Sequence, residues 1–315
     1  MIHEPTVLIL GAGASMPYKF PSGEELRNLI CGLSIPGNEN HQFLVQQLEC
    51  DSGELRHFAR TFHGSNIKSI DAFLARRPEF TAFGKLSIAT LLCQKELPKR
   101  VIPGDAENNP DDHWYYYLWN VLVEEANTVG EFIGNQIRFI TFNYDRSLEY
   151  FLHTSIKNTY GVSDEEALAI LGNIPILHVY GCLGEFHFLA GGNRRQFSNG
   201  IDAERIRIAT TAIKVIPEDR EHDPFLIARQ WCYEANKIGF LGFGFDELNI
   251  ERLGLKDVLD SRNKDKHDRP LVVASAYDKT QAERNHYQSL VSPRNPWGAF
   301  DQKCTRTLRE SGLLH

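Results

Sequence analysis

Four segments of the 315-residue chain place glycine or polar side chains within or directly after a short apolar stretch. They are Leu10-Gly-Ala-Gly-Ala-Ser15, Phe139-Ile-Thr-Phe-Asn-Tyr-Asp145, Ile176-Leu-His-Val-Tyr-Gly-Cys-Leu-Gly184 and Phe240-Leu-Gly-Phe-Gly-Phe-Asp-Glu-Leu-Asn249. Glycine leaves the backbone amides accessible, while Asn, Asp and His side chains bind hydroxyl groups or carry protons. The four segments therefore predict ligand binding and proton transfer at the ends of buried strands.

The first segment has the backbone expected of a phosphate-binding turn. Gly11 and Gly13 carry no side chain, so their amides can approach a phosphate or a ribose closely. The dinucleotide fingerprint G-x-G-x-x-G is incomplete, because Met16 stands where the third glycine would be. Nucleotide binding and a plain tight turn are equally compatible with this segment.

Asn143 and Asp145 follow an apolar strand at its carboxyl end, where ligands bind in open α/β sheets. Asp145 is also well placed to cap the helix predicted over Arg146–Ile156. His178 has the side chain best suited to proton transfer near neutral pH. A lone histidine within an apolar strand is nevertheless more often a hydrogen-bonded core residue, and both interpretations stay open.

In the fourth segment, Gly242 permits close backbone approach after a strand. Asp246 follows it and has a simple structural alternative, the N-cap of a helix that begins at Glu247.

Five apolar segments alternate with helical patterns, which favours a doubly wound, Rossmann-like α/β fold with a parallel sheet. The predicted strands are Thr6–Leu10, Ile137–Phe142, Ile174–Tyr180, Lys237–Phe243 and Leu271–Ala276. Capping boxes at Ser22 and Ser163, and the Asp223-Pro224 pair, predict three helix starts.

The first two strands are too far apart for a simple crossover, and apolar residues between them recur at helical spacing. We interpret residues 38–135 as a helical insertion, interrupted by a polar loop over 103–112 and closed by a helix that opens with the aromatic run Trp114–Trp119. This run is typical of core or interface packing, and exposed aromatics such as Tyr115 or Trp119 could equally contact a partner. Residues 1–290 form the main domain in this scheme. Residues 291–315 form a C-terminal tail that packs on the domain or on a neighbouring subunit. The stretch from Asp278–Leu290 on to Leu314 is predicted to form one or two helices, with a break between Pro293 and Pro296.

Composition excludes several functional classes. The net charge of −7 gives no general attraction to nucleic acids or anionic lipids, so neither sequence-specific nucleic-acid binding nor a membrane partner is expected. No apolar run approaches the ~20 residues that span a bilayer. The six cysteines include no C-x-x-C pair, which predicts no zinc ribbon and no thioredoxin motif, and no metal ligands are predicted for the main hypothesis. Scattered cysteines without a signal peptide are typical of a cytoplasmic protein.

Together the four segments resemble the sirtuin superfamily, in particular the sirtuin-like proteins of bacterial anti-phage defence systems. Gly11–Ser15, followed by Phe20-Pro-Ser-Gly-Glu-Glu-Leu26, is similar to the opening of those proteins. Thr141-Phe-Asn-Tyr-Asp145 resembles their T-x-N-Y-D motif, the counterpart of Q-N-I-D in protein deacetylases.

The later segments extend this resemblance. His178, followed by Tyr180-Gly181, is similar to the catalytic H-G segment with two residues inserted. Gly242–Asn249 resembles the late glycine-rich segment that ends in D-x-N. Asp71 stands where many of these proteins carry an acidic residue before a helix, and this match is the loosest.

The resemblance implies that NAD⁺ is the substrate and that its nicotinamide–ribose bond is hydrolysed. Deacetylating sirtuins carry a four-cysteine zinc module that is not encoded here, so the resemblance implies hydrolysis without zinc rather than deacetylation. Asn143 would orient the water or the ribose hydroxyls, His178 would act as general base, and Asp145 would hold the nicotinamide carboxamide. The remaining NAD⁺-binding positions implied are Gly11, Ala12, Gly13, Ser15, Asp71, Gly181, Gly242 and Asn249.

The resemblance also implies a role in abortive infection, in which NAD⁺ is depleted. The sheet pattern leaves no room for a sensor domain, so control would come from homo-oligomerisation or from a separate partner. A HerA-type DNA-translocating ATPase is the preferred partner and a short Argonaute the second.

Three alternatives stay open. The first is a catalytically silent NAD⁺ or ADP-ribose sensor, and the second is a deacylase or ADP-ribosyltransferase. The third is a nuclease subunit that uses the acids Asp111, Asp112, Asp145 and Asp246.

Overall fold

The computed structural model describes residues 1–102, 112–189, 192–215, 223–264, 269–291 and 297–315. A six-stranded parallel sheet forms its centre, in the order β3-β2-β1-β6-β7-β8. These strands are β1 (Thr6–Leu10), β2 (Ile137–Thr141), β3 (Ile176–His178), β6 (Lys237–Leu241), β7 (Leu271–Ser275) and β8 (Trp297–Phe300). Counted within this sheet alone, the order is 3-2-1-4-5-6, that of doubly wound Rossmann-like folds. The predicted fold class is confirmed.

All five predicted strands are present within their predicted bounds, and β3 is the most shortened. They form because each is apolar enough to be covered by helices on both faces. In β1, which lies between β2 and β6, Leu8 and Ile9 are fully inaccessible to solvent.

The sixth strand, β8, was not predicted, and the expectation of only helices after residue 290 is wrong for Trp297–Phe300. These four residues pair in parallel with β7, and α15 (Cys304–Glu310) then packs against β7 and α6. Their side chains are all only half-buried, so the segment lacks the uniform apolarity that identifies the inner strands. Pro293 and Pro296 lie outside the described residues.

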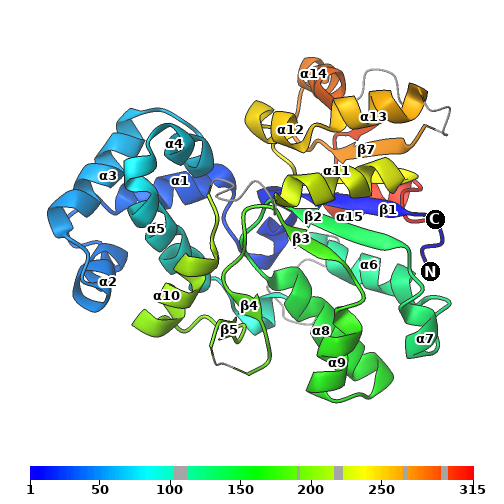
Figure 1. The fold of residues 1–315 in the computed structure, drawn as a ribbon, viewed down its shortest axis with the longest axis horizontal. Helices are drawn as coiled ribbons and strands as arrows, with labels where there is room; N and C mark the ends of the chain where they lie inside the picture. Colours follow the sequence, from blue (N-terminus) through cyan, green and yellow to red (C-terminus); the bar gives the residue numbers. More distant parts are fainter. Residues whose placement is uncertain (103–111, 190–191, 216–222, 265–268, 292–296) are drawn as a thin grey trace.

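Helices cover both faces of the sheet (Figure 1). One layer contains α6 (Trp114–Val123), α8 (Ser147–Tyr160) and α15, with α7 (Val129–Phe132) and α9 (Asp164–Leu171) beside them. The other contains α11 (Pro224–Glu234), α12 (Glu247–Leu253), α13 (Leu255–Lys264) and α14 (Gln281–Val291). The capping boxes at Ser22 and Ser163 and the cap at Asp223 are confirmed.

The remaining helices form a separate helical lobe, seen at the left of Figure 1. It consists of α1 (Gly23–Gly32), α2 (Glu39–Leu48), α3 (Ser52–Gly64), α4 (Ile70–Arg76), α5 (Thr81–Cys93) and α10 (Ala203–Ala212). Aromatic rings fill its centre, among them Phe58, Phe62 and Phe73. A small parallel pair, β4 (Glu185–Phe186) and β5 (Arg194–Arg195), lies near α10.

The lobe begins before residue 38, because α1 packs on α3 and α5. The aromatic run that opens α6 lies in the sheet layer instead, since α6 packs on α8 and α15. Trp114, Tyr115 and Trp119 are buried, and Trp114 Nε1 donates to the Ala14 carbonyl, which confirms the core interpretation for these three residues, whereas Tyr116 is exposed. Of the predicted polar loop, residues 103–111 lie outside the described part.

No helix in the described ranges combines the length and apolarity that crossing a lipid bilayer requires.

Candidate functional site

The carboxyl ends of β1, β2 and β3 bring several of the predicted residues around one small space, here called the His178 cavity. Its lining consists of Leu10, Ser15, Tyr115, Thr141, Asn143, Asp145, Leu148, Glu149, Ile176 and His178. Its volume is about 10 Å³, about the space of one water molecule. Ser15, Asn143, Asp145 and His178, predicted from three separate segments, thus meet at one place.

Asn143 ties the end of β2 to the turn after β1. Its side-chain Nδ2 donates to the Gly11 carbonyl at 2.9 Å and to Ser15 Oγ at 3.0 Å. Its backbone N–H donates to Thr141 Oγ1 at 3.0 Å. Both amide hydrogens of the side chain therefore have partners within the protein.

His178 has a partner at each ring nitrogen. Nδ1 lies 2.8 Å from the Asn143 carbonyl oxygen, and Nε2 lies 2.6 Å from Glu149 Oε1. The two side chains are only 11 % and 13 % exposed, so water screens the pair weakly. Burial alone would lower the pKa of His178, but the Glu149 carboxylate, the Asn143 carbonyl and Asp145 together outweigh it, and the pKa lies above its ordinary 6.5.

Glu149 was missed by the sequence analysis. The signal available was an acidic residue in the first turn of a helix that follows a strand with polar residues at its end. Nothing in the linear sequence indicates that its carboxylate turns towards β3.

Asp145 accepts hydrogen bonds from the backbone N–H and the hydroxyl of Ser147, at the start of α8. The N-cap of α8 is Arg146, so Asp145 binds the first residue of the helix from one position before the cap rather than as the predicted cap itself. Ser147 Oγ also lies 2.8 Å from the Tyr115 hydroxyl, which carries the polar chain across to α6. Burial raises the pKa of Asp145, whereas its hydrogen bonds with Ser147 act in the opposite direction and lower it.

The glycines of the first and fourth segments pack against each other. A Cβ atom on Gly11 would lie 2.7 Å from the Gly242 oxygen, and one on Gly242, whose φ is +57°, would lie 2.0 Å from the Ala14 nitrogen. Gly11 N–H donates to the Leu241 carbonyl and Gly13 N–H to the Gly242 carbonyl, at 3.0 and 2.9 Å. The amides of Ala14 and Ser15 donate within the turn, to Gly11 and Ala12. The close approach is thus between β1 and β6, at the point where the strand order reverses.

A second group of polar side chains, here called the Tyr180 cluster, joins the helical lobe to α12. Its members are Asp71, Tyr144, Tyr180, Asn249 and Arg252. Tyr144 donates its hydroxyl hydrogen to Asp71 Oδ1. The Tyr180 hydroxyl donates to Asn249 Oδ1 and accepts from Arg252 Nη1, each at 2.6 Å. Burial, with Asp71 nearby, raises the pKa of Tyr180 to about 12.

The structure thus brings two predicted residues, Asp71 and Asn249, into the Tyr180 cluster rather than to the His178 cavity. Tyr144, Tyr180 and Arg252 received no predicted role of their own. Gly181 lies next to Tyr180 at a φ of +67° and packs against the end of α10, where its Cβ would lie 2.1 Å from the Ala212 oxygen. This contact leaves no space for a ligand at Gly181 itself.

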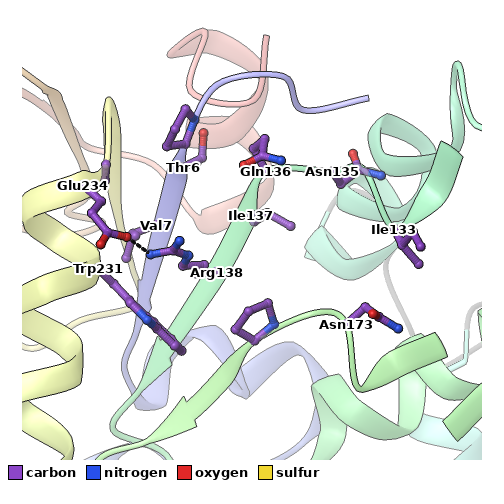
Figure 2. A pocket seen from close by; sticks show the side chains of 13 residues that line it. Thr6, Val7, Ile133, Asn135, Gln136, Ile137, Arg138, Asn173, Trp231 and Glu234 are labelled. Atoms are coloured by element: carbon purple, nitrogen blue, oxygen red, sulfur yellow. Dashed lines mark hydrogen bonds and ion pairs between the residues drawn. The ribbon is translucent and has the colours of Figure 1, made fainter. Parts of the chain in front are cut away.

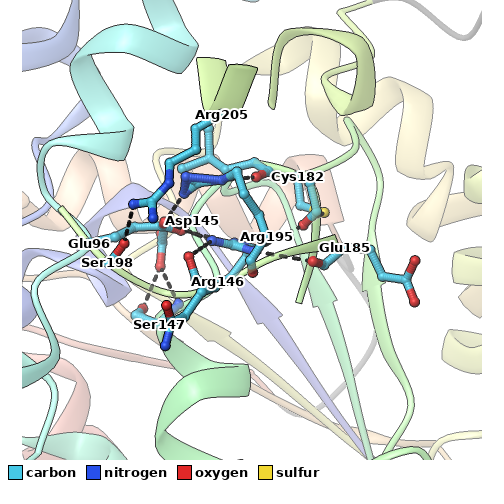
Figure 3. A network of polar contacts seen from close by, with 12 residues as sticks. Glu96, Asp145, Arg146, Ser147, Cys182, Glu185, Arg195, Ser198 and Arg205 are labelled. Carbon is cyan, nitrogen blue, oxygen red and sulfur yellow. Dashed lines mark hydrogen bonds and ion pairs between the residues drawn. The ribbon is translucent and has the colours of Figure 1, made fainter. Parts of the chain in front are cut away.

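A buried ion cluster supports the loop that carries Asn143 and Asp145 (Figure 3). The Arg146 guanidinium binds Glu96 through Nε at 2.9 Å and through Nη2 at 2.7 Å, and Arg195 binds the same carboxylate. All three side chains are almost completely inaccessible to solvent. Since Glu96 follows α5, the cluster connects the helical lobe to the His178 cavity.

A larger cavity of about 290 Å³ lies at the opposite, amino-terminal edge of the sheet (Figure 2). Arg138 and Glu234 pair across it at 2.5 Å, and Trp231 lies below the Arg138 guanidinium. No predicted site residue lines it. Ligands of open α/β sheets bind at the carboxyl edge, so the candidate site is the His178 cavity.

The described acidic residues of the nuclease alternative do not lie together in one site. Asp112 pairs with Lys303, Asp145 faces the His178 cavity, and Asp246 caps α12 through the Asn249 N–H. Asp111 lies outside the described residues. Within the described ranges, no three His, Cys, Asp or Glu side chains gather closely enough to hold a metal ion.

No protein-family model matches this chain, and no curated protein matches its sequence significantly. The sirtuin-like relationship stays a prediction.

Proposed function

We propose that this chain is a sirtuin-like NAD⁺ hydrolase that cleaves the nicotinamide–ribose bond and depletes NAD⁺ in antiviral defence. The observation that carries the proposal is the meeting of Ser15, Asn143, Asp145 and His178 around one cavity at the carboxyl edge of a Rossmann-like sheet. Open α/β sheets bind ligands at this edge, and the four residues come from three segments whose residue types suit ligand binding and proton transfer.

The reaction passes through an oxocarbenium-like state, as glycoside hydrolysis does. Nicotinamide leaves from a cationic precursor, so no general acid is needed. In the proposed reaction Asn143 orients the ribose hydroxyls or the attacking water, and His178 accepts a proton at Nε2. Asp145 holds the carboxamide, and Gly11–Ser15 lies against the diphosphate.

Asp71, Gly181, Gly242 and Asn249 are proposed for the rest of the nucleotide. The packing of Gly181 and Gly242 favours a supporting role for both, in which they shape the loops beside the ligand.

The His178 cavity is far smaller than a nucleotide, and its polar groups are paired with one another. We infer that the described arrangement is a resting form that opens before NAD⁺ enters. Opening would be the step controlled by self-association or by a partner, of which a HerA-type ATPase is our first choice and a short Argonaute the second.

The test is NAD⁺ consumption, with released nicotinamide followed by chromatography, at increasing protein concentration and with the candidate partners. Asn143→Ala and His178→Ala should each lower the rate about 10²–10⁴-fold, the usual contribution of a positioned acid–base group. Asn158→Ala and His286→Ala alter exposed residues of the same types and should keep the wild-type rate. Wild-type activity in both cavity variants would refute the assignment.

One observation favours a second candidate, a nucleotide sensor without catalysis. Both ring nitrogens of His178 and both amide hydrogens of Asn143 are bound within the protein, as in a structural network. Calorimetry separates the two functions: tight NAD⁺ binding without nicotinamide release, with every candidate partner present, would identify a sensor.

A further inference from the structure

Glu149 departs from the way in which this chain uses glutamate at the same position of other helices. Glu25 in α1, Glu131 in α7 and Glu166 in α9 are the third residue of their helices, and each accepts a hydrogen bond from the N-cap backbone N–H. Those bonds measure 2.7, 2.9 and 2.8 Å. This reciprocal capping is the ordinary role of glutamate three residues after the cap.

Glu149 is likewise the third residue of α8, but the cap of that helix, Arg146, has no side-chain capping bond. The N–H of Ser147, the first residue of the helix, donates to Asp145. The Glu149 carboxylate points to β3 and lies 2.6 Å from His178 Nε2. Glu149 therefore binds His178 rather than the N-cap backbone of its own helix.

The protons on His178 can be placed from its two contacts. The Asn143 carbonyl oxygen can only accept a hydrogen bond, so Nδ1 carries a hydrogen and donates it. One further proton then lies between Nε2 and the Glu149 carboxylate. Nε2 can take a proton from a ribose hydroxyl or a water only after this resident proton has left.

Other ionisable groups face the pair from each neighbouring element. Asp145 lies in the loop before α8 and favours the charged imidazole, whereas burial opposes it. The Tyr115 phenol approaches from α6 and the Cys182 thiol from the turn after β3, and the pKa of both groups is raised by burial. Glu149 is thus the carboxylate in direct contact with the ring.

We propose that Glu149 is a positioning residue for the proposed hydrolase, which fixes the His178 ring and sets the pH at which Nε2 becomes free to accept a proton. The proposal rests on the proposed function. In the step itself, an O–H bond of ribose or water breaks, an N–H bond forms at Nε2, and the electron pair stays on the oxygen. Glu149 gains no bond to substrate.

The contact between His178 and Glu149 determines whether the reaction rate rises or falls with pH. Because the pKa of His178 in the folded protein lies above 6.5, the free base, and with it the rate, should increase with pH through a value above 6.5. Glu149→Gln removes the carboxylate but keeps the burial, so the ascending limb should move to lower pH. The pair with Glu149 contributes its full stabilisation below the ordinary histidine pKa of 6.5, which applies to the unfolded chain. This stabilisation is lost as the pH rises through the pKa of His178 in the folded protein, which is higher.

The experiment has two readouts on the full chain. NMR titration of the imidazole signals, with the His178 signal assigned from its loss in His178→Ala, gives the ring pKa without activity. We expect Glu149→Gln to lower it by about one unit or more, and Glu149→Asp, which keeps the charge, to lower it less. Glu165→Gln removes an exposed carboxylate of the same chain and should leave it unchanged.

The second readout is the pH profile of nicotinamide release, whose ascending limb should shift in the same direction as the titration. A merely structural role would lower the rate at every pH without moving the limb. An unchanged His178 titration in Glu149→Gln, or equal shifts in the Gln and Asp variants, would overturn the role of Glu149. With the candidate partners present and at high protein concentration, no nicotinamide release by any variant or by wild type would instead refute the proposed function, while the titration still decides on Glu149.

Discussion

The His178 cavity and the Tyr180 cluster lie at the same edge of the sheet, and only Val179 separates their central residues in sequence. The cavity takes its polar groups from the turn after β1, the end of β2, the start of α8 and β3. The Tyr180 cluster takes its groups from α4 in the helical lobe, from the loop after β2 and from α12. The first is local to the strand ends, whereas the second bridges two parts of the molecule.

The two regions are also joined to the lobe by different chemistry. The loop beside the cavity is held through a fully buried ion cluster, in which Arg146 binds Glu96. The Tyr180 cluster is held through a hydrogen bond from Tyr144 to Asp71. Charges removed from water depend strongly on their counterions, so we expect the two attachments to differ in how much stability each loses on mutation.

The largest effect is expected for Glu96→Gln. This change leaves two buried guanidinium groups, of Arg146 and Arg195, without a counterion. Breaking a buried ion pair by removal of one partner costs about 3–5 kcal/mol, so the free energy of unfolding should fall by about that amount. Urea denaturation followed by circular dichroism measures it.

Glu79→Gln is the matched control for Glu96→Gln. It breaks an ion pair with Arg77 in which both side chains are exposed, and pairs of this kind contribute little. Equal losses in the two variants would show that the buried cluster is not what holds the cavity loop to the lobe.

A smaller effect is expected for Tyr144→Phe. The variant keeps the ring but removes the hydroxyl that donates to Asp71, whose carboxyl then loses a hydrogen bond within the protein. A hydrogen bond to a charged group contributes about 1.5–3 kcal/mol, so the loss should lie below that of Glu96→Gln. Thermal unfolding measures the loss of stability. Tyr116→Phe, which removes the hydroxyl of an exposed tyrosine in α6, is the control. A Tyr144→Phe loss larger than that of Glu96→Gln would reverse the comparison.

The comparison also explains which parts of the site are predictable from sequence. The strand ends are predictable, because a short, mainly apolar stretch followed by glycine or polar residues is typical of a buried strand meeting its turn. This reasoning brought Ser15, Asn143, Asp145 and His178 to one edge, where they share a cavity. It could not find Glu149, whose helical position predicts a bond to the N-cap backbone N–H, whereas the structure places its carboxylate against His178.

Contacts between segments that are far apart in the sequence are harder to predict from strand patterns. Asp71 and Asn249 were predicted as ligand contacts, yet each has a partner that only the placement of the lobe and of α12 reveals. The strand β8 was missed for a related reason. Its four half-buried residues gain their structure from β7 rather than from a pattern of their own.

The smallest effect is expected at the far end of the Tyr180 cluster. Asp246 is exposed and caps α12 by accepting from the Asn249 N–H at 3.2 Å, while the Asn249 side chain accepts from Tyr180. Asp246→Ala should cost about 1 kcal/mol, the usual value of an N-cap, and Asp246→Asn should recover most of it. Because the cap lies outside the His178 cavity, neither variant should move the His178 titration. A shift in that titration would show that the cavity and the cluster are coupled, and would remove the distinction drawn between them.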